Sequence, residues 1–314
     1  MKKIISAILA VLLISACVAL CACGTPAGTE KPASKTNEAS EPVKTTPENT
    51  KNTPASETGN GDSGESNDDS SLAVLAKIAL SSSGAQIDGQ GAAYADGVVT
   101  VTTSGAYEIT GSSDNCSIVV SVDKSEKVEL ILAGVSITNP TGPAIWCDSA
   151  DKLLVTAKEG TKNTLKDSAN YKDPNGPNAA LYSDDDMTVR GPGALTVIGL
   201  YKNGISSKND VKITGDIQLT VEAYNTGIRG KDSVNVVSGT LKITAGNDGL
   251  KATAEDKPGK GVVTVEGGEI AITAGDDGIQ AATVITVSGG SFNITAGDKK
   301  TNAPTVNVEN ATGL

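Results

Sequence analysis

Histidine is absent from this 314-residue chain, and aromatic residues make up only 3% of it. The missing histidine excludes imidazole-based acid–base catalysis and histidine-ligated metal sites. Because a globular core normally contains more aromatic side chains, the composition favours thin layers filled by Val, Ile, Leu and Ala. A formal net charge of -11 disfavours nucleic acid as a partner, since phosphate binding needs clustered Lys and Arg.

Cysteine is scarce in the part of the chain that can fold. Beyond the N-terminal segment only Cys116 and Cys147 remain. They could form one disulfide or lie as two small buried thiols, and the sequence alone leaves both alternatives open.

Helical periodicity is also missing, and short alternating runs of β-branched residues take its place. The runs recur around four glycines, Gly204, Gly227, Gly249 and Gly278, at steps of 23, 22 and 29 residues. The long step contains a charged stretch near 253–260, which is typical of a looped-out insertion. A period of about 22 residues with one insertion indicates a solenoid.

The repeat predicts an all-β, right-handed parallel β-helix with three short strands per coil. Leucine-rich and helical repeats are excluded because their leucine frames and helices are missing. A β-propeller would need about 40 residues per blade. One coil cannot bury its own apolar face, so the coils must stack to form a core. The right-handed sense is taken by analogy with most large β-helices.

The N-terminus predicts a secreted and anchored protein. Residues 1–23 combine a basic start, an apolar run and a lipobox-like end, which indicates a lipoprotein signal peptide with Cys23 as the lipidated residue. Cys17 is the alternative lipidation site, and simple secretion is the alternative fate. Two acyl chains would hold the protein stably on the extracellular face of the membrane. Residues 24–71 are rich in Ser, Thr, Pro and Glu and predict a disordered tether with a span of roughly 40 Å.

Several motifs of the remaining residues, 72–314, resemble those of a known family. They are Ala-Tyr-Glu-Ile-Thr-Gly at 106–111, Val-Glu-Leu-Ile-Leu-Ala-Gly-Val-Ser-Ile-Thr at 128–138, Glu-Gly-Thr-Lys-Asn-Thr-Leu at 159–165 and the Ala-Gly-Asp-Asp-Gly-Ile type of repeat. Together they resemble the clostridial carbohydrate-binding domain, a β-helix similar in fold to pectate lyases. The resemblance implies a right-handed parallel β-helix, bound calcium and binding of plant cell-wall polysaccharide, including acidic pectin-like chains.

Stacking the coils on their glycines predicts an acidic cluster in the last coils. It contains Asp248, Asp276, Asp277, Asn247 and Asp298. Coils lie about 4.8 Å apart, so the carboxylates repel unless a hard cation lies between them. Ca²⁺ takes such oxygen ligands. We therefore expect a calcium site, with a metal-free ladder of turn residues as the alternative.

A column of outward-facing residues predicts the ligand-binding face. Each follows an inward-facing Ile or Leu, and its members include Trp146, Tyr182, Arg229 and Lys251. The aromatic pair suits stacking on sugar rings, and the cations suit uronate carboxylates. In the alternative interpretation Trp146 packs under the 170–178 loop, and the two cations are solvated or neutralise nearby aspartates.

These features favour a non-catalytic, calcium-binding lipoprotein that binds plant cell-wall polysaccharide, either cellulose or acidic pectin-like chains. A calcium-dependent polysaccharide lyase of the pectate type is the first alternative, with Lys251 or Arg229 as the base that abstracts the α-proton. The sequence has no decisive lyase motif, so binding is preferred. A structural surface adhesin with protein partners is the second alternative.

Overall fold

The computed structural model describes residues 71–314. The predicted signal peptide 1–23, its Cys23 and all but the last residue of the predicted tether 24–71 lie outside the described residues. The described part consists of strands joined by turns, which confirms the all-β class. Within it, no helix has the length and hydrophobicity needed to cross a membrane.

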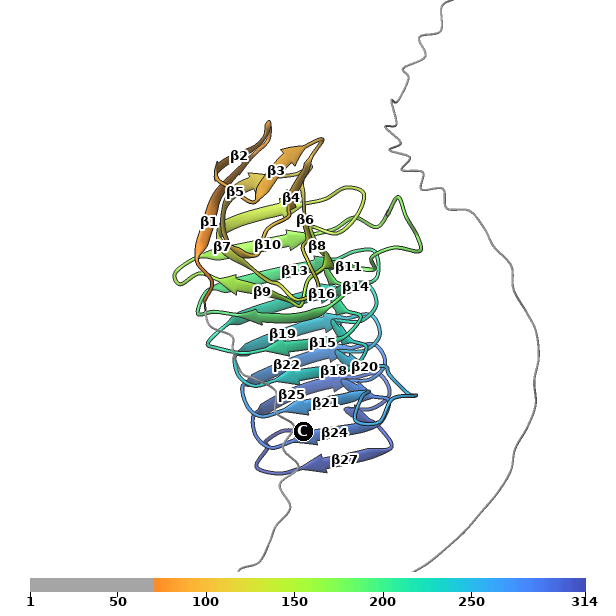
Figure 1. Cartoon of the computed structure of the whole chain (residues 1–314). Coiled ribbons are helices and arrows are strands. Elements are labelled where there is room, and N and C mark those ends of the chain that lie inside the picture. Colours follow the sequence, from red (N-terminus) through yellow and green to blue (C-terminus); the bar gives the residue numbers. More distant parts are fainter. Residues whose placement is uncertain (1–70) are drawn as a thin grey trace, which may run out of the picture. The chain divides into compact units, whose positions relative to one another are not determined.

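Equivalent strands of successive coils pair in parallel, as expected for a parallel β-helix (Figure 1). Each complete coil contributes three strands. The first strands of the coils form a ten-stranded sheet. In chain order this sheet contains β3 (Ala92–Ala95), β4 (Val98–Val101), β6 (Ser117–Ser121), β8 (Ile145–Ser149), β11 (Ala179–Ser183), β14 (Asn203–Ser207), β17 (Ile228–Gly230), β20 (Leu250–Ala252), β23 (Ile279–Ala281) and β26 (Thr301–Asn302).

The other two faces belong to one 17-stranded sheet because the long strand β7 (Lys127–Thr138) serves both. Its first half pairs with β9 and its second half with β10. The second strands are β9 (Lys152–Ala157), β12 (Asp186–Arg190), β15 (Asp210–Ile213), β18 (Ser233–Val236), β21 (Val262–Val265), β24 (Val284–Val287) and β27 (Thr305–Val308). The third strands are β1 (Val74–Ser81), β5 (Gly105–Ser113), β10 (Lys162–Lys166), β13 (Ala194–Gly199), β16 (Gln218–Ala223), β19 (Thr240–Ala245), β22 (Glu269–Ala274) and β25 (Ser291–Ala296).

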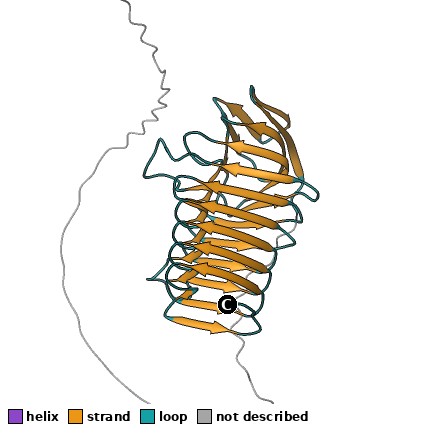
Figure 2. Cartoon of the chain, turned by 180° about the vertical axis from the view of Figure 1, so that it is seen from behind, coloured by secondary structure: helices purple, strands orange, loops and turns teal. Residues whose placement is uncertain are grey.

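The N-terminal end of the β-helix is built differently. Strand β2 (Gly84–Gly89) pairs antiparallel with β1, and β3 pairs antiparallel with β4. Figure 2 shows the coils stacked along one axis with these antiparallel strands at one end. They cover the first coil, so that its apolar interior is not exposed to water.

The core follows from the alternation of each strand. In the ten-stranded sheet Ile205, Ile228, Leu250 and Ile279 lie one above another and are fully buried. Each such side chain contributes roughly 1.5–3 kcal/mol of transfer free energy on burial. The residue after each points outward, which is the pattern used above to predict a binding column.

Cys116 and Cys147 are both buried free thiols, which resolves the open alternatives in favour of no disulfide. Burial raises the pKa of the Cys147 thiol to about 12. A thiol held neutral at physiological pH is a poor nucleophile, so these residues serve the core.

The recurring glycines are required by close packing between coils. At Gly249 a Cβ atom would lie 2.5 Å from the Ile272 Cγ2 atom and 2.5 Å from the Gly278 carbonyl oxygen of the next coil. Gly204, Gly227 and Gly278 face equivalent core methyl groups of Val or Ile. The period visible in the sequence therefore marks the points where one coil approaches the next most closely.

We predict that Gly249→Ala lowers the free energy of unfolding by roughly 1–3 kcal/mol, because the added methyl group overpacks the core. Urea denaturation measures this change. Gly142→Ala is the matched control, since its Cβ would meet only the Asn139 side chain at 3.4 Å. Equal stability of the two variants would contradict the packing explanation.

Candidate functional site

The predicted acidic cluster lies in the turns between the third-strand face and the ten-stranded sheet. Backbone hydrogen bonds between coils fix its register: Gly249 N donates to Asp277 O at 3.0 Å, and Gly227 N donates to Asp248 O at 2.9 Å. A parallel row forms as Asp276 N donates to Asn247 O at 3.0 Å and Asp298 N donates to Asp276 O at 2.8 Å. The predicted stacking of these positions is confirmed.

Three carboxylates from these two rows meet. One ligand oxygen each from Asp248, Asp276 and Asp277 lie within 4.8 Å of one another. Asp248 and Asp277 are each only 1% exposed, and the Oδ1 atom of each is buried without a hydrogen-bond partner. Burial, together with the charges of Asp277, Asp248 and Asp298, raises the pKa of Asp276. An unpaired buried carboxylate oxygen costs free energy unless a cation or donor satisfies it.

This donor set fits a hard divalent cation. All three groups offer carboxylate oxygens, which Ca²⁺ prefers. Asn247 and Asp298 lie in the same row as Asp276, but they are exposed and are not part of the three-carboxylate group. On the coils above, the row changes to amides: Asn225 Nδ2 donates to Asn203 Oδ1 at 3.3 Å. The ladder interpretation therefore describes the upper coils, and the carboxylates are confined to the lower ones.

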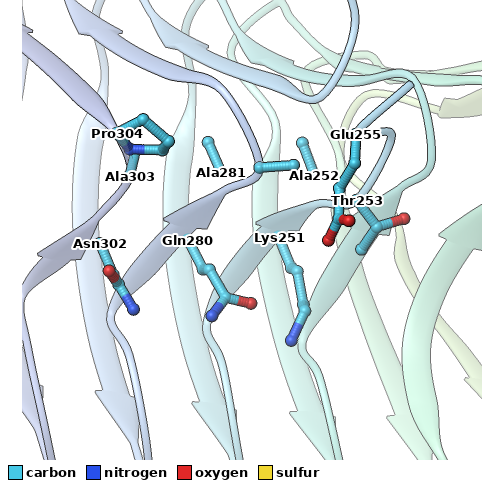
Figure 3. Close-up of a pocket in the computed structure, with 10 residues that line it drawn as sticks. Lys251, Ala252, Thr253, Glu255, Gln280, Ala281, Asn302, Ala303 and Pro304 are labelled. Atoms are coloured by element: carbon cyan, nitrogen blue, oxygen red, sulfur yellow. The ribbon is translucent and has the colours of Figure 1, made fainter. Parts of the chain in front are cut away.

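A groove of about 470 Å³ lies on the ten-stranded sheet beside these aspartates. Lys251, Gln280 and Asn302 come from successive strands and extend side by side in the same direction (Figure 3). Thr253 and Glu255 of the insertion lie at one end of the groove (Figure 3). The remaining lining residues are small: Ala252, Ala281, Ala282, Ala303 and Pro304. These small side chains leave room for a ligand next to the row.

The groove and the acidic cluster share side chains. Lys251 Nζ lies 2.7 Å from Asp248 Oδ2, and Gln280 Nε2 donates to Asp277 Oδ2 at 3.1 Å. Asn302 Nδ2 donates to the same oxygen of Asp277 at 2.7 Å. The groove residues thus engage one oxygen of each buried aspartate and leave the other oxygen unpaired. Asn302 is a site residue that the sequence analysis did not predict. Its strand, β26, has only two residues, and so short a run is not recognisable as a strand in the sequence.

The insertion is held in place by a second acidic turn. Lys260 Nζ lies 3.4 Å from Asp210 Oδ2 and 3.7 Å from Asp232 Oδ2. Lys257 Nζ lies 3.6 Å from Asp232 Oδ1. These lysines neutralise the turn and position the segment that carries Glu255 at one end of the groove.

Other residues of the protein cover the part of the predicted column that precedes Lys251. Tyr182 is only 4% exposed, and burial, followed by the charge of and hydrogen bond to Asp184, raises its pKa. Arg229 donates from Nη2 to Thr253 Oγ1 at 3.0 Å, and burial lowers its pKa. Trp146 lies in a separate hollow with the loop residues 173–177. The four predicted residues are in register, but they do not form one continuous open strip.

The loop 168–178 is anchored by aromatic stacking. The rings of Tyr171 and Tyr201 lie 4.2 Å apart between centroids at an interplanar angle of 17°. The Tyr171 hydroxyl donates to Asp167 Oδ2 at 2.7 Å, and the Leu200 backbone N donates to Asp167 Oδ1. Asp167 is 1% exposed, and burial raises its pKa to about 6.

Known proteins resemble this chain in sequence and in fold. A family model described as "Carbohydrate-binding domain-containing protein" matches residues 95–313. A protein of the same description from Acetivibrio thermocellus is 37% identical over 155 residues, or 48% of this chain and 54% of that relative. The chain therefore spans about half the length of that curated relative. A solved polysaccharide lyase-like protein from C. thermocellum, a gadolinium derivative, has a TM-score of 0.73 and 34% identity, covering 76% of this chain and all of the other.

We predict that Asp167 makes stability depend on pH. Its folded-state pKa of about 6 exceeds the ordinary value of 3.8, so the folded state holds the proton more tightly. The resulting stability is present at low pH and is lost as the pH rises through 6. At 1.36 kcal/mol per pKa unit the loss is about 3 kcal/mol. Asp167→Asn should flatten this part of the profile in urea denaturation at pH 4–7, and an unchanged slope would contradict the assignment.

Proposed function

Because this chain belongs to the carbohydrate-binding domain-containing protein family, we propose that its groove binds a polysaccharide without cleaving it. The observation that carries this proposal is the row of Lys251, Gln280 and Asn302 along a groove whose other lining residues are mostly small. One ammonium group and two amide groups supply the hydrogen-bond donors and acceptors that sugar hydroxyls need. The groove is open, which suits the middle of a long chain.

The proposed ligand is plant cell-wall polysaccharide, with acidic pectin-like chains preferred over cellulose. Strands of the sheet are about 4.8 Å apart, which is close to the length of one pyranose residue in an extended chain. A chain running across successive coils would therefore meet one rung of the groove with each sugar. The Lys251 ammonium group, next to the acidic cluster, offers a positive charge to a uronate carboxylate.

The proposed cofactor is Ca²⁺, held by Asp248, Asp276 and Asp277. Support comes from the two buried Oδ1 atoms without partners and from the proximity of all three carboxylates. Bound there, the ion would neutralise the cluster and supply a positive charge at the edge of the groove. Asp298 and Asn247, which lie in the same row as Asp276, are proposed as outer partners of the same ion.

A calcium-dependent lyase is the second candidate, because a solved relative is described as polysaccharide lyase-like. A lyase needs a basic side chain that reaches the α-proton of a uronate. Lys251 is ion-paired with Asp248, and Arg229 is hydrogen-bonded to Thr253. Both candidate bases are engaged within the protein, so binding without cleavage is preferred. The adhesin alternative has no specific observation in its favour.

The proposed location is the extracellular face of the cell membrane, through lipidation of Cys23. This part of the proposal rests on the sequence of residues 1–23 alone. A polysaccharide-binding domain attached there would hold the polymer at the cell surface.

We expect Ca²⁺ to raise the melting temperature of chelator-treated protein, because an ion that binds only the folded state stabilises it. At a concentration of 100 times the Kd the gain is about 2.7 kcal/mol. Asp248→Asn combined with Asp277→Asn should abolish the response to Ca²⁺, whereas the exposed Asp256→Asn should preserve it. A melting curve that is indifferent to Ca²⁺ in the unsubstituted protein would remove the ion from the proposal.

Retention on polygalacturonate gel and on insoluble cellulose tests the groove itself. Lys251→Gln keeps a donor for Asp248 but removes the charge, and we expect it to weaken retention on polygalacturonate about tenfold or more. Lys242→Gln, on the third-strand face, is the matched control and should bind normally. Full retention by Lys251→Gln would contradict the proposed site, and ultraviolet absorbance from unsaturated sugar in the supernatant would establish the lyase instead.

A further inference from the structure

A small hollow on the middle coils is separate from the groove. It has a volume of about 150 Å³, close to that of a single pyranose residue. Its lining includes Trp146 and Tyr182 of neighbouring strands, and Asp173, Asn175, Gly176 and Pro177 of the 168–178 loop. Asp184 and Lys208 complete its lining.

The indole nitrogen of Trp146 points to a missing partner. Trp146 Nε1 is buried and has no hydrogen-bond partner among the described residues. A buried indole N–H normally donates to an acceptor, and leaving it unpaired costs free energy. In a polar hollow of this size, a hydroxyl or ring oxygen of a sugar would satisfy it, with the indole ring as an apolar surface.

The remaining groups define the chemistry of the ligand. Asp173 and Asp184 offer carboxylate oxygens, and Lys208 Nζ lies 2.6 Å from Asp184 Oδ1. Two carboxylates and one ammonium group leave the hollow with a net negative charge, which repels a uronate. Carboxylates accept hydrogen bonds from neighbouring hydroxyls of a neutral sugar, and the lysine and indole donate to its oxygens.

The 168–178 loop supplies half of the residues that line the hollow. Its anchors are the Tyr171–Tyr201 stack and the backbone hydrogen bond from Lys172 N to Thr141 O at 3.0 Å. An anchored loop keeps this lining in place. At about 150 Å³ against about 470 Å³ for the groove, the hollow has room for a single residue or a chain end.

From these observations we infer that the hollow is a second carbohydrate site, which binds one neutral pyranose residue as a free sugar or as the end of a chain. The inference rests on the proposed function for the general class of ligand. It separates the two sites by chemistry: the groove around Lys251 takes acidic chains, and the hollow around Trp146 takes a neutral sugar.

Trp146 is the only tryptophan of the chain, so intrinsic fluorescence reports on this hollow directly. The probes are glucose, galactose, xylose and galacturonate, each titrated into the full-length protein without Ca²⁺. At least one neutral sugar should shift the emission with saturation, and galacturonate should bind at least tenfold more weakly. Saturable shifts from none of the neutral sugars, or a preference for galacturonate, would overturn the inference.

Two substitutions in the hollow and one in the groove complete the test. Asp184→Asn should weaken binding of the neutral sugar at least tenfold, and the more exposed Lys208→Ala is the second variant if Asp184→Asn does not fold. Lys251→Gln should leave the fluorescence titration unchanged while reducing retention on polygalacturonate. An unchanged Kd in both hollow variants would overturn the inference.

The two proposals fail separately. A neutral sugar that shifts Trp146 emission in a protein that does not retain polygalacturonate would support the hollow and contradict the groove. Retention of polygalacturonate without any response of Trp146 to neutral sugars would support the groove and contradict the hollow.

Discussion

Hydrogen bonds between parallel strands set the spacing and the register of the stacked coils. They hold equivalent positions about 4.8 Å apart, so a residue type that recurs in the sequence becomes a column in space. Columns of Ile and Leu are stabilised by this arrangement, since each side chain buries apolar surface of its neighbour. Columns of aspartate do not, because carboxylates at this spacing repel one another.

The protein resolves that repulsion at two places along its axis and leaves it partly unresolved at a third. On the upper coils amides replace carboxylates, as in the Asn203–Asn225 hydrogen bond. At the second acidic turn, Lys257 and Lys260 of the insertion supply the opposing charge. In the lower coils Lys251 neutralises only part of the cluster, and buried oxygens remain without partners. The unresolved charge next to an open groove is what distinguishes the proposed site from the other two turns.

The sequence predicted the features that follow from periodicity. The glycine register gave the order of the coils, the stacking of Asp248 with Asp277 and the outward position of Lys251. Contacts that break the period could not be predicted in the same way. The stacking of Tyr171 on Tyr201 depends on a loop of irregular sequence, which has no equivalent in the other described coils. The position of Asn302 depends on a strand of only two residues, which is too short to be recognised in the sequence. Burial of Tyr182 depends on neighbours outside its own column, which periodicity does not describe.

If the unpaired aspartate oxygens and the groove form one binding site, one ion and one sugar should bind there together. A crystal structure of the protein soaked with Ca²⁺ and an oligogalacturonide would show this. We expect an ion ligated by Asp248, Asp276 and Asp277, with a sugar carboxylate over Lys251 in the adjacent groove. An ion bound elsewhere, or an oligosaccharide on another face with the groove empty, would contradict it.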